Sequence, residues 1–315
     1  MPHATDTLYA TRTQASLLCG AGMLLAYALL GRFAPAAAEW LSVALILCAG
    51  FPHGADDMHL LRLLGARSRG RQAVAFVAYV ATLGATLLLW AASPALALAA
   101  FVVVSVAHFA GDHVAQLRGD RGELRVYGWC WAAFALLAPL SWRPAEVEPV
   151  VAAMLGAPPP AGLLAGAGWL AAAAGAAAIA YAGWRWRRGG STAWLAEIVQ
   201  VLLLAHCYLV FPSLWGFALF FVGVHANASV LNQAAWTGGT VRAHLRRGLP
   251  YALAGIAGVP ALLVAGYGAA LTPVWLAGLF VLISAFTMPH AVVMHVAAAR
   301  FLPSRPAPAP GLVGG

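Results

Sequence analysis

The sequence predicts an all-α fold, a polytopic membrane helix bundle with about ten transmembrane helices and with both termini in the cytoplasm. Hydrophobic residues make up 62% of the 315 residues, and charged residues make up only 9%. Several apolar runs are long enough to cross a hydrocarbon core of about 30 Å. Arginines lie mainly in the short segments between these runs, which is typical of a multi-pass membrane protein.

Apolar length and the turn residues between the runs place the individual helices. We expect the helices near residues 14–32, 37–53, 72–92, 94–114, 125–142, 161–183, 192–211, 213–236, 250–270 and 273–300.

The arginines test this assignment independently, because arginines in short loops stay on the cytoplasmic side. With the N-terminus inside, sixteen of the eighteen arginines are cytoplasmic and only Arg32 and Arg143 are external. The predicted location is the cell inner (cytoplasmic) membrane, which the chain is expected to cross several times. The predicted cytoplasmic set is Arg12, Arg62, Arg67, Arg69, Arg71, Arg118, Arg121, Arg125, Arg185, Arg187, Arg188, Arg242, Arg246, Arg247, Arg300 and Arg305.

Residues 1–302 are expected to form a single transmembrane domain, followed by a disordered proline-rich tail at 303–315. We also expect a proline-rich external loop at 143–161. The first helix has an alternative reading as a signal peptide, because Arg12 and an apolar stretch precede a run of three alanines at 36–38. Cleavage there would remove that helix and leave the remaining orientation unchanged.

The formal net charge of +8 does not indicate a nucleic-acid partner. Such a surface needs basic residues gathered on a soluble face together with stacking aromatic residues, and these arginines lie between apolar segments. The four cysteines lie in apolar segments without a CxxC spacing, so they predict neither a zinc site nor a disulfide framework.

Four histidines, His53, His108, His225 and His290, lie within or at the ends of predicted spans that all run from outside to inside. Three of them come nine or ten residues before the next arginine in the chain. At about 1.5 Å per residue, this puts their rings near half depth or slightly toward the cytoplasm. His225 shares the layer if its helix ends near residue 236. Ionisable residues at this depth mark a functional site by default.

A second group of polar residues accompanies these histidines. His53 with Asp57 and His108 with Asp112 are i, i+4 pairs, a spacing that puts two side chains on one helix face. A carboxylate there could accept the second N–H of a metal-bound imidazole. Glu197, near the inner end of its helix, is expected to join the same shell. Ser229 continues a polar stripe one turn after His225.

Other polar residues are expected to play no part in this cluster. His59 and His113 are predicted to be interfacial, and Asp56 to be solvated or to cap a helix. His206 is expected near the outer end of a helix, and His244 in a polar segment.

The strings GFPHGADD (50–57), AHFAGD (107–112), FALFFVGVH (217–225) and TMPH (287–290), with Glu197 between the second and third, resemble in order the motifs of the Brp/Blh family. These are membrane-embedded β-carotene 15,15'-dioxygenases. The resemblance implies a non-haem Fe(2+) held by His53, His108 and His225. It also implies O2-dependent cleavage of the central double bond of β-carotene, or a related polyene, to retinal. A functional link to a rhodopsin is left open.

The chain departs from the family pattern at Ser229, where the family has a second ligand histidine, and at His295, where an acidic residue is expected. Either His290 or His295 could supply the missing nitrogen, but not both, because five residues on a straight helix separate their directions by about 140°. Depth favours His290 as the metal ligand and leaves His295 in the surrounding shell. The departure leaves open a diverged or weakly active enzyme.

Two other function classes use the same residues. A b-type haem protein would use histidine pairs on facing helices as axial ligands. A proton-coupled transporter would use histidines and aspartates as a relay. A Soret band would favour the former, and paired structural repeats with broken helices would favour the latter.

Overall fold

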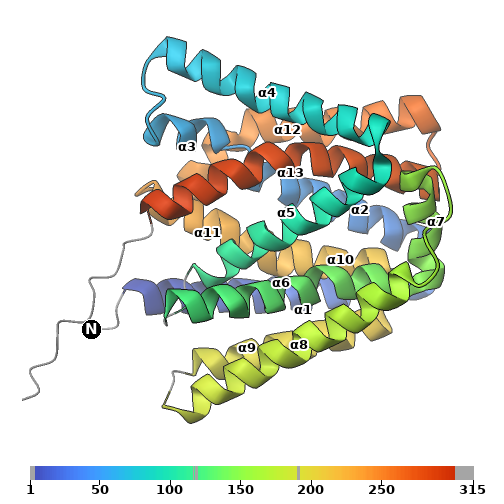
Figure 1. Ribbon diagram of the computed structural model, residues 1–315, viewed down its shortest axis with the longest axis horizontal. Helices are drawn as coiled ribbons and strands as arrows, with labels where there is room; N and C mark the ends of the chain where they lie inside the picture. The colour runs from blue at the N-terminus through green and yellow to red at the C-terminus, as the bar shows by residue number, and fades with distance from the viewer. Residues whose placement is uncertain (1–3, 116, 118–119, 190–191, 302–315) are drawn as a thin grey trace, which may run out of the picture.

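The protein is a bundle of long helices (Figure 1), seen in a computed structural model that describes residues 4–115, 117, 120–189 and 192–301. No strand occurs among these residues, so the predicted all-α class is confirmed. The predicted tail lies outside the described residues. The helices are α1 (Ala4–Phe33), α2 (Pro35–Gly54), α3 (Asp57–Leu63), α4 (Arg69–Ala92), α5 (Pro94–Val114), α6 (Arg121–Ser141), α7 (Pro144–Leu155), α8 (Leu163–Arg187), α9 (Ala193–Val210), α10 (Ser213–Phe220), the π-helix η1 (Phe221–Ala226), α11 (Asn227–Trp236), α12 (Val241–Tyr267) and α13 (Pro273–Phe301).

Nine helical segments among the described residues are long and apolar enough to cross a membrane. The tenth expected span corresponds to α6, a helix of 21 residues that is not among the nine. Much of its apolar surface comes from tryptophan and tyrosine, which weigh less than aliphatic residues on a hydropathy scale. Tyr127, Trp131 and Phe134 on this helix are nevertheless buried, so α6 is an internal member of the bundle.

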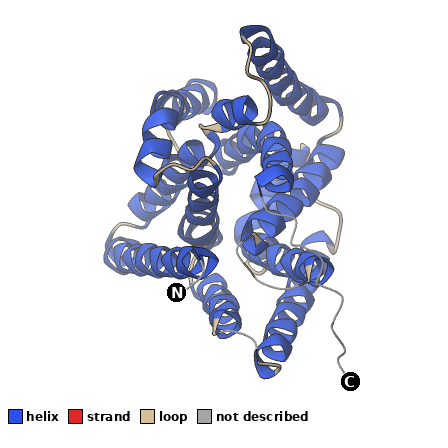
Figure 2. Cartoon of the chain, turned by 90° about the vertical axis from the view of Figure 1, so that its left-hand side faces the viewer, coloured by secondary structure: helices blue, strands red, loops and turns tan. Residues whose placement is uncertain are grey.

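The two ends of the bundle differ in charge. The segments that join α3 to α4, α8 to α9 and α11 to α12 lie at the left-hand end in Figure 1, where α1 begins and α13 ends. Figure 2, which looks at the molecule from this end, shows helices joined by short loops. Described arginines at this end include Arg62, Arg67, Arg69, Arg71, Arg185, Arg187, Arg188, Arg242, Arg246, Arg247 and Arg300. That this end is cytoplasmic stays a prediction.

The expected external loop at 143–161 is wrong over most of its length, because Pro144–Leu155 forms α7. Proline is favoured in the first turn of a helix, where its missing N–H is not needed. Gly156 ends the helix with φ 70° and ψ 9°, a left-handed conformation that glycine adopts without strain. These start and stop signals outweigh the proline content of the segment.

Helix α12 begins nine residues earlier than the expected start at 250. The Thr240 side chain caps it by accepting a hydrogen bond of 3.1 Å from the Ala243 N–H. His244 and Arg247 therefore belong to a helix, and His244 is fully buried. His244 was expected in a polar segment outside the helices, and the structure instead buries it within α12.

Small residues bring several helices close together, as expected where association depends on backbone approach. Ala171, Ala174, Gly175, Ala178 and Ala182 form the buried stripe of α8, which packs on α6. A Cβ at Gly175 would lie 2.8 Å from the Phe134 ring. A Cβ at Gly255 would similarly lie 2.3 Å from the Phe51 ring, so glycine is needed where α12 meets α2.

The central element is the span Ser213–Trp236, of which 72% is buried, compared with 6–44% for the other spans. It was expected to be one helix, but six residues near its middle, Phe221–Ala226, form the π-helix η1. π-Helical turns are rare and frequently occur at functional sites. His225 lies in this turn, which sets the direction in which its ring points.

Candidate metal centre

Four helical segments each bring one histidine to the same place in the bundle. His53 comes from the end of α2, His108 from α5, His225 from η1 and His290 from α13, and all four are buried. The rings form a closed circuit. The centroid distances are 4.8 Å from His53 to His290, 4.9 Å from His290 to His108, 4.9 Å from His108 to His225 and 5.2 Å from His225 to His53.

The nitrogens of these rings lie within reach of a single ion. One donor atom from each of His53, His108 and His290 lies within 4.8 Å of the others, and the same holds for His108, His225 and the carboxylate of Asp112. Donors bound to one ion at about 2.0–2.2 Å are separated by at most about 4.4 Å. Separations of 4.8 Å or less are close to this value, and the donor atoms are of the right chemistry to share one ion.

Three of these rings also hold a nitrogen without a hydrogen-bond partner. The Nε2 atoms of His108, His225 and His290 are all buried and unpaired within the described part of the chain. An unpaired polar group in an apolar interior costs a few kcal/mol. Neutral imidazole nitrogens are donors that divalent transition metals bind readily, so the residues present fit such an ion.

Backbone and carboxylate oxygens fix which nitrogen of two rings faces inward. His53 Nδ1 lies 3.4 Å from the Ala49 carbonyl oxygen, and His290 Nδ1 lies 2.9 Å from Asp57 Oδ1. An N–H at each Nδ1 donates to these acceptors and leaves Nε2 with its lone pair. This is how ligand imidazoles are usually oriented in metal sites.

Asp57 does contact the histidine cluster, but its expected partner was wrong. It was paired with His53 because both were assumed to lie on one continuous helix. Helix α2 ends at Gly54 and α3 begins at Asp57, so a turn separates the two residues. The carboxylate faces His290 instead, and it also accepts a hydrogen bond of 3.0 Å from the Tyr79 hydroxyl.

Asp112 does share the face of its own helix with His108, as the i, i+4 spacing predicts. Its Oδ2 lies 4.0 Å from His108 Nε2 and also 4.0 Å from His225 Nδ1. The Asn232 side-chain amide donates to the Asp112 backbone carbonyl at 3.2 Å, which ties α5 to α11 beside the cluster.

Comparison with known proteins identifies the group to which this arrangement belongs. A family model described as beta-carotene 15,15'-dioxygenase matches residues 44–297, a stretch that holds all four histidines and most of the bundle. The chain belongs to the beta-carotene 15,15'-dioxygenase family. No curated protein and no solved structure matches it. The resemblance seen in the sequence motifs is thus confirmed at the level of the family.

A glutamine that the sequence analysis did not single out supports the histidine cluster. Gln233 Nε2 donates to the His53 carbonyl at 2.7 Å and to Ser229 Oγ at 3.1 Å. The first bond satisfies a buried backbone carbonyl at the end of α2, one residue after Pro52, which lies inside that helix. Ser229 is fully buried. The sequence signal that could have pointed to Gln233 is a glutamine in an apolar span, eight residues after the candidate ligand His225.

Glu197 was expected beside the metal, and the structure places it in a separate cluster. Its Oε2 accepts a hydrogen bond of 2.6 Å from the Tyr127 hydroxyl and lies 2.5 Å from His113 Nε2. His113 stacks on Trp131 at 3.5 Å and is buried in this cluster, while its predicted place at the membrane interface stays a prediction. The network has a physical reason: it gives a buried carboxylate between α5, α6 and α9 two polar partners.

His295, expected in the shell around the metal, is exposed on the outer side of α13. The angular separation of about 140° explains why His295 is exposed. When His290 projects from the inner face of α13, His295 projects from the outer face. His206 is also exposed, and His59 is half-buried.

Asp56 was expected to be solvated or to cap a helix. It precedes α3 at the capping position but makes no side-chain capping bond, and it is buried. Its Oδ2 lies 3.0 Å from His244 Nδ1 and accepts a hydrogen bond of 2.8 Å from Arg247 Nη2. These contacts hold the α2–α3 turn against α12.

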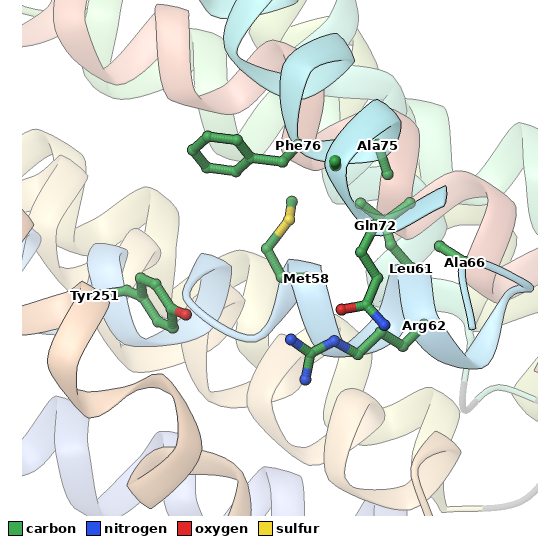
Figure 3. Close-up of a pocket in the computed structure, with 9 residues that line it drawn as sticks. Met58, Leu61, Arg62, Ala66, Gln72, Ala75, Phe76 and Tyr251 are labelled. Atoms are coloured by element: carbon green, nitrogen blue, oxygen red, sulfur yellow. The ribbon is translucent and has the colours of Figure 1, made fainter. Parts of the chain in front are cut away.

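A groove of about 280 Å³ lies on the outer side of α3, between α4 and α12 (Figure 3). Met58, Phe76 and Tyr251 surround its opening and Arg62 lies at one side, but none of the four histidines lines it. Its volume is below the range of about 300–1,000 Å³ that is usual for drug-sized ligands. We therefore do not assign the polyene to this groove.

Proposed function

We propose that the chain is an iron(II)-dependent dioxygenase that cleaves the central double bond of β-carotene, or of a related polyene, with O2. One C40 polyene and one O2 give two molecules of retinal, with one oxygen atom in each aldehyde. The observation that carries the proposal is the closed circuit of four buried imidazoles within a chain that belongs to this family.

His53, His108, His225 and His290 would hold the ion. Iron(II) bound by neutral nitrogen ligands supplies a site for O2 activation. Imidazoles alone do not select iron over copper or zinc, so the choice of iron rests on the family and on the oxidative chemistry. His290 is favoured as the fourth ligand, because its unpaired Nε2 completes the circuit.

The surroundings of the cluster suit an apolar substrate. The Phe109 ring lies 4.3 Å from the His225 ring, and Phe221 lies 5.6 Å from His225 and 5.7 Å from His53. Phe217 of α10 stacks on Phe221 and also contacts Phe280 of α13. Aromatic side chains therefore extend from the histidines along α10. These side chains exclude water and can orient a rigid conjugated chain with one bond toward the ion.

The haem and transporter alternatives gain no support. Family membership favours the oxygenase over both. Four imidazoles packed edge to face around one point also differ from a pair of axial ligands on opposite faces of a porphyrin. The inner-membrane location, O2 as co-substrate and any link to a rhodopsin stay predictions.

Retinal production tests the proposal directly. The chain should bleach a bacterium that accumulates β-carotene, and retinal should be detected by chromatography of the extract, whereas His53→Ala should leave the carotene intact. Ser229→His is a useful third variant. If cells with the parent chain keep their colour and cells with Ser229→His lose it, the parent chain folds correctly but has lost its activity through the change at Ser229. If none of the three cleaves carotene or a related polyene, the proposed reaction is wrong.

The choice between His290 and His295 can be tested on one helix. His290→Ala should lower the iron content of the purified protein at least about 10-fold, because it removes a ring that faces the cluster and a ligand held by Asp57. His295→Ala should leave the iron content unchanged, since that side chain is exposed. Elemental analysis of detergent-purified protein measures both, and the reverse pattern would contradict the ligand assignment.

A further inference from the structure

We infer that Asp112 is itself a ligand of the metal, so that the site consists of four histidines and one carboxylate. The inference rests on the proposed function and deepens it by adding an anionic donor that neither the family match nor the sequence motifs assign. The sequence analysis placed Asp112 only in the shell around the ligands. Three observations favour the closer role.

The first observation is distance. Asp112 Oδ2 lies 4.0 Å from His108 Nε2 and 4.0 Å from His225 Nδ1, so the inference takes Nδ1, and not Nε2, as the donor atom of His225. Both distances exceed a hydrogen bond, which rarely extends beyond about 3.2 Å between N and O. Both remain within the separation of about 4.4 Å that two ligands of one ion can have. An oxygen equally far from two candidate ligands is placed as a third ligand would be.

The second observation is that the two donor groups share a member. One contains His53, His108 and His290, and the other contains His108, Asp112 and His225. The buried unpaired nitrogen of His108 is Nε2, and this is also the nitrogen that faces Asp112. A ring nitrogen has a single lone pair and binds one ion. An ion bound by His108 Nε2 would therefore lie beside a residue common to both groups and within reach of Asp112.

The third observation is charge. Asp57 and Asp112 are the carboxylates beside the four histidines, and they are 2% and 4% exposed, respectively. The nearby Arg247 forms its ion pair with a different carboxylate, that of Asp56. Four neutral imidazoles around a divalent ion leave two positive charges in an apolar interior, which is costly. The carboxylate that orients His290 and a second carboxylate on the ion bring the total to zero.

A direct role predicts a spectroscopic change that an orienting carboxylate would not cause. Purified apoprotein titrated with cobalt(II) chloride should give visible absorption bands whose position and intensity report the ligands of the ion. Asp112→Asn should shift these bands and weaken cobalt binding by more than about 100-fold. Asp57→Asn provides the matched comparison, because it alters a carboxylate that demonstrably contacts a ring N–H. It should weaken binding by about 10–100-fold and leave the bands in place.

Two further variants keep the outcome clear. Asp112→Glu retains a carboxylate in the same layer and should keep cobalt bound with an altered spectrum, even if Asp112→Asn unfolds. Glu39→Gln removes an exposed carboxylate and should change nothing. Unchanged bands in both Asp112 variants would overturn the inference while leaving the histidine site intact. Cobalt binding that survives His108→Ala would instead overturn the metal site itself, and with it the proposed function.

Discussion

Replacing His108 with alanine should abolish metal binding and carotene cleavage together. His108 belongs to both donor groups, and its Nε2 is buried and unpaired in the described structure. Loss of this ring removes the one nitrogen on which both groups depend. Because metal-bound chemistry contributes several kcal/mol to catalysis, the rate of retinal formation should fall at least about 1,000-fold.

Thermal unfolding in detergent gives a second measurement of the same effect. A ligand that binds only the folded state raises the stability in proportion to the logarithm of its concentration over Kd. Added iron(II) or cobalt(II) should therefore raise the Tm of the parent chain and of His206→Ala, whose ring is exposed. It should not raise the Tm of His108→Ala. An equal metal-dependent rise in all three would show that His108 is not a ligand.

Replacing Glu197 with glutamine should lower the free energy of unfolding by about 3–5 kcal/mol. Its carboxylate is 1% exposed and is shared by the Tyr127 hydroxyl and the His113 ring. Glutamine presents an N–H₂ group where an acceptor is needed and leaves buried partners unsatisfied. The measurement is the Tm of the metal-free protein, so that any loss of metal does not enter the comparison.

The chain offers a matched control for this change. Glu123 Oε2 also accepts from a tyrosine, Tyr181 at 3.0 Å, and from a cation, Arg185 at 3.2 Å. Its side chain is 42% exposed, so water replaces the lost contacts and Glu123→Gln should cost less than about 1 kcal/mol. Equal losses for the two variants would contradict the structural role given to the Glu197 network.

The histidine layer could be predicted from the sequence because depth in a membrane follows from position along a helix. A helix rises by a fixed length per residue, and the arginines mark its cytoplasmic end. A histidine nine or ten residues before an arginine therefore has a predictable depth in the membrane. The four histidines are indeed brought together. That they bind iron stays a prediction, which the iron content of the purified protein tests.

Partner assignments were less predictable, because they depend on contacts between helices. Asp57 was matched to His53 by spacing, but the turn after Gly54 directs it to His290, far away in sequence. Glu197 and His113 were treated separately, yet they meet across α9 and α5. The π-turn at His225 has no simple sequence signature, since it depends on how the surrounding helices pack.

Taken by itself, the sequence determined the class of the protein, the approximate positions of its long helices and the shared level of its four buried histidines. These properties follow from apolar length and from arginine placement, which act on each helix separately. The tertiary structure decided which polar groups touch. Hydrogen bonds and coordination depend on separations of a few ångströms between side chains of different helices, and helical spacing within one segment does not fix those separations.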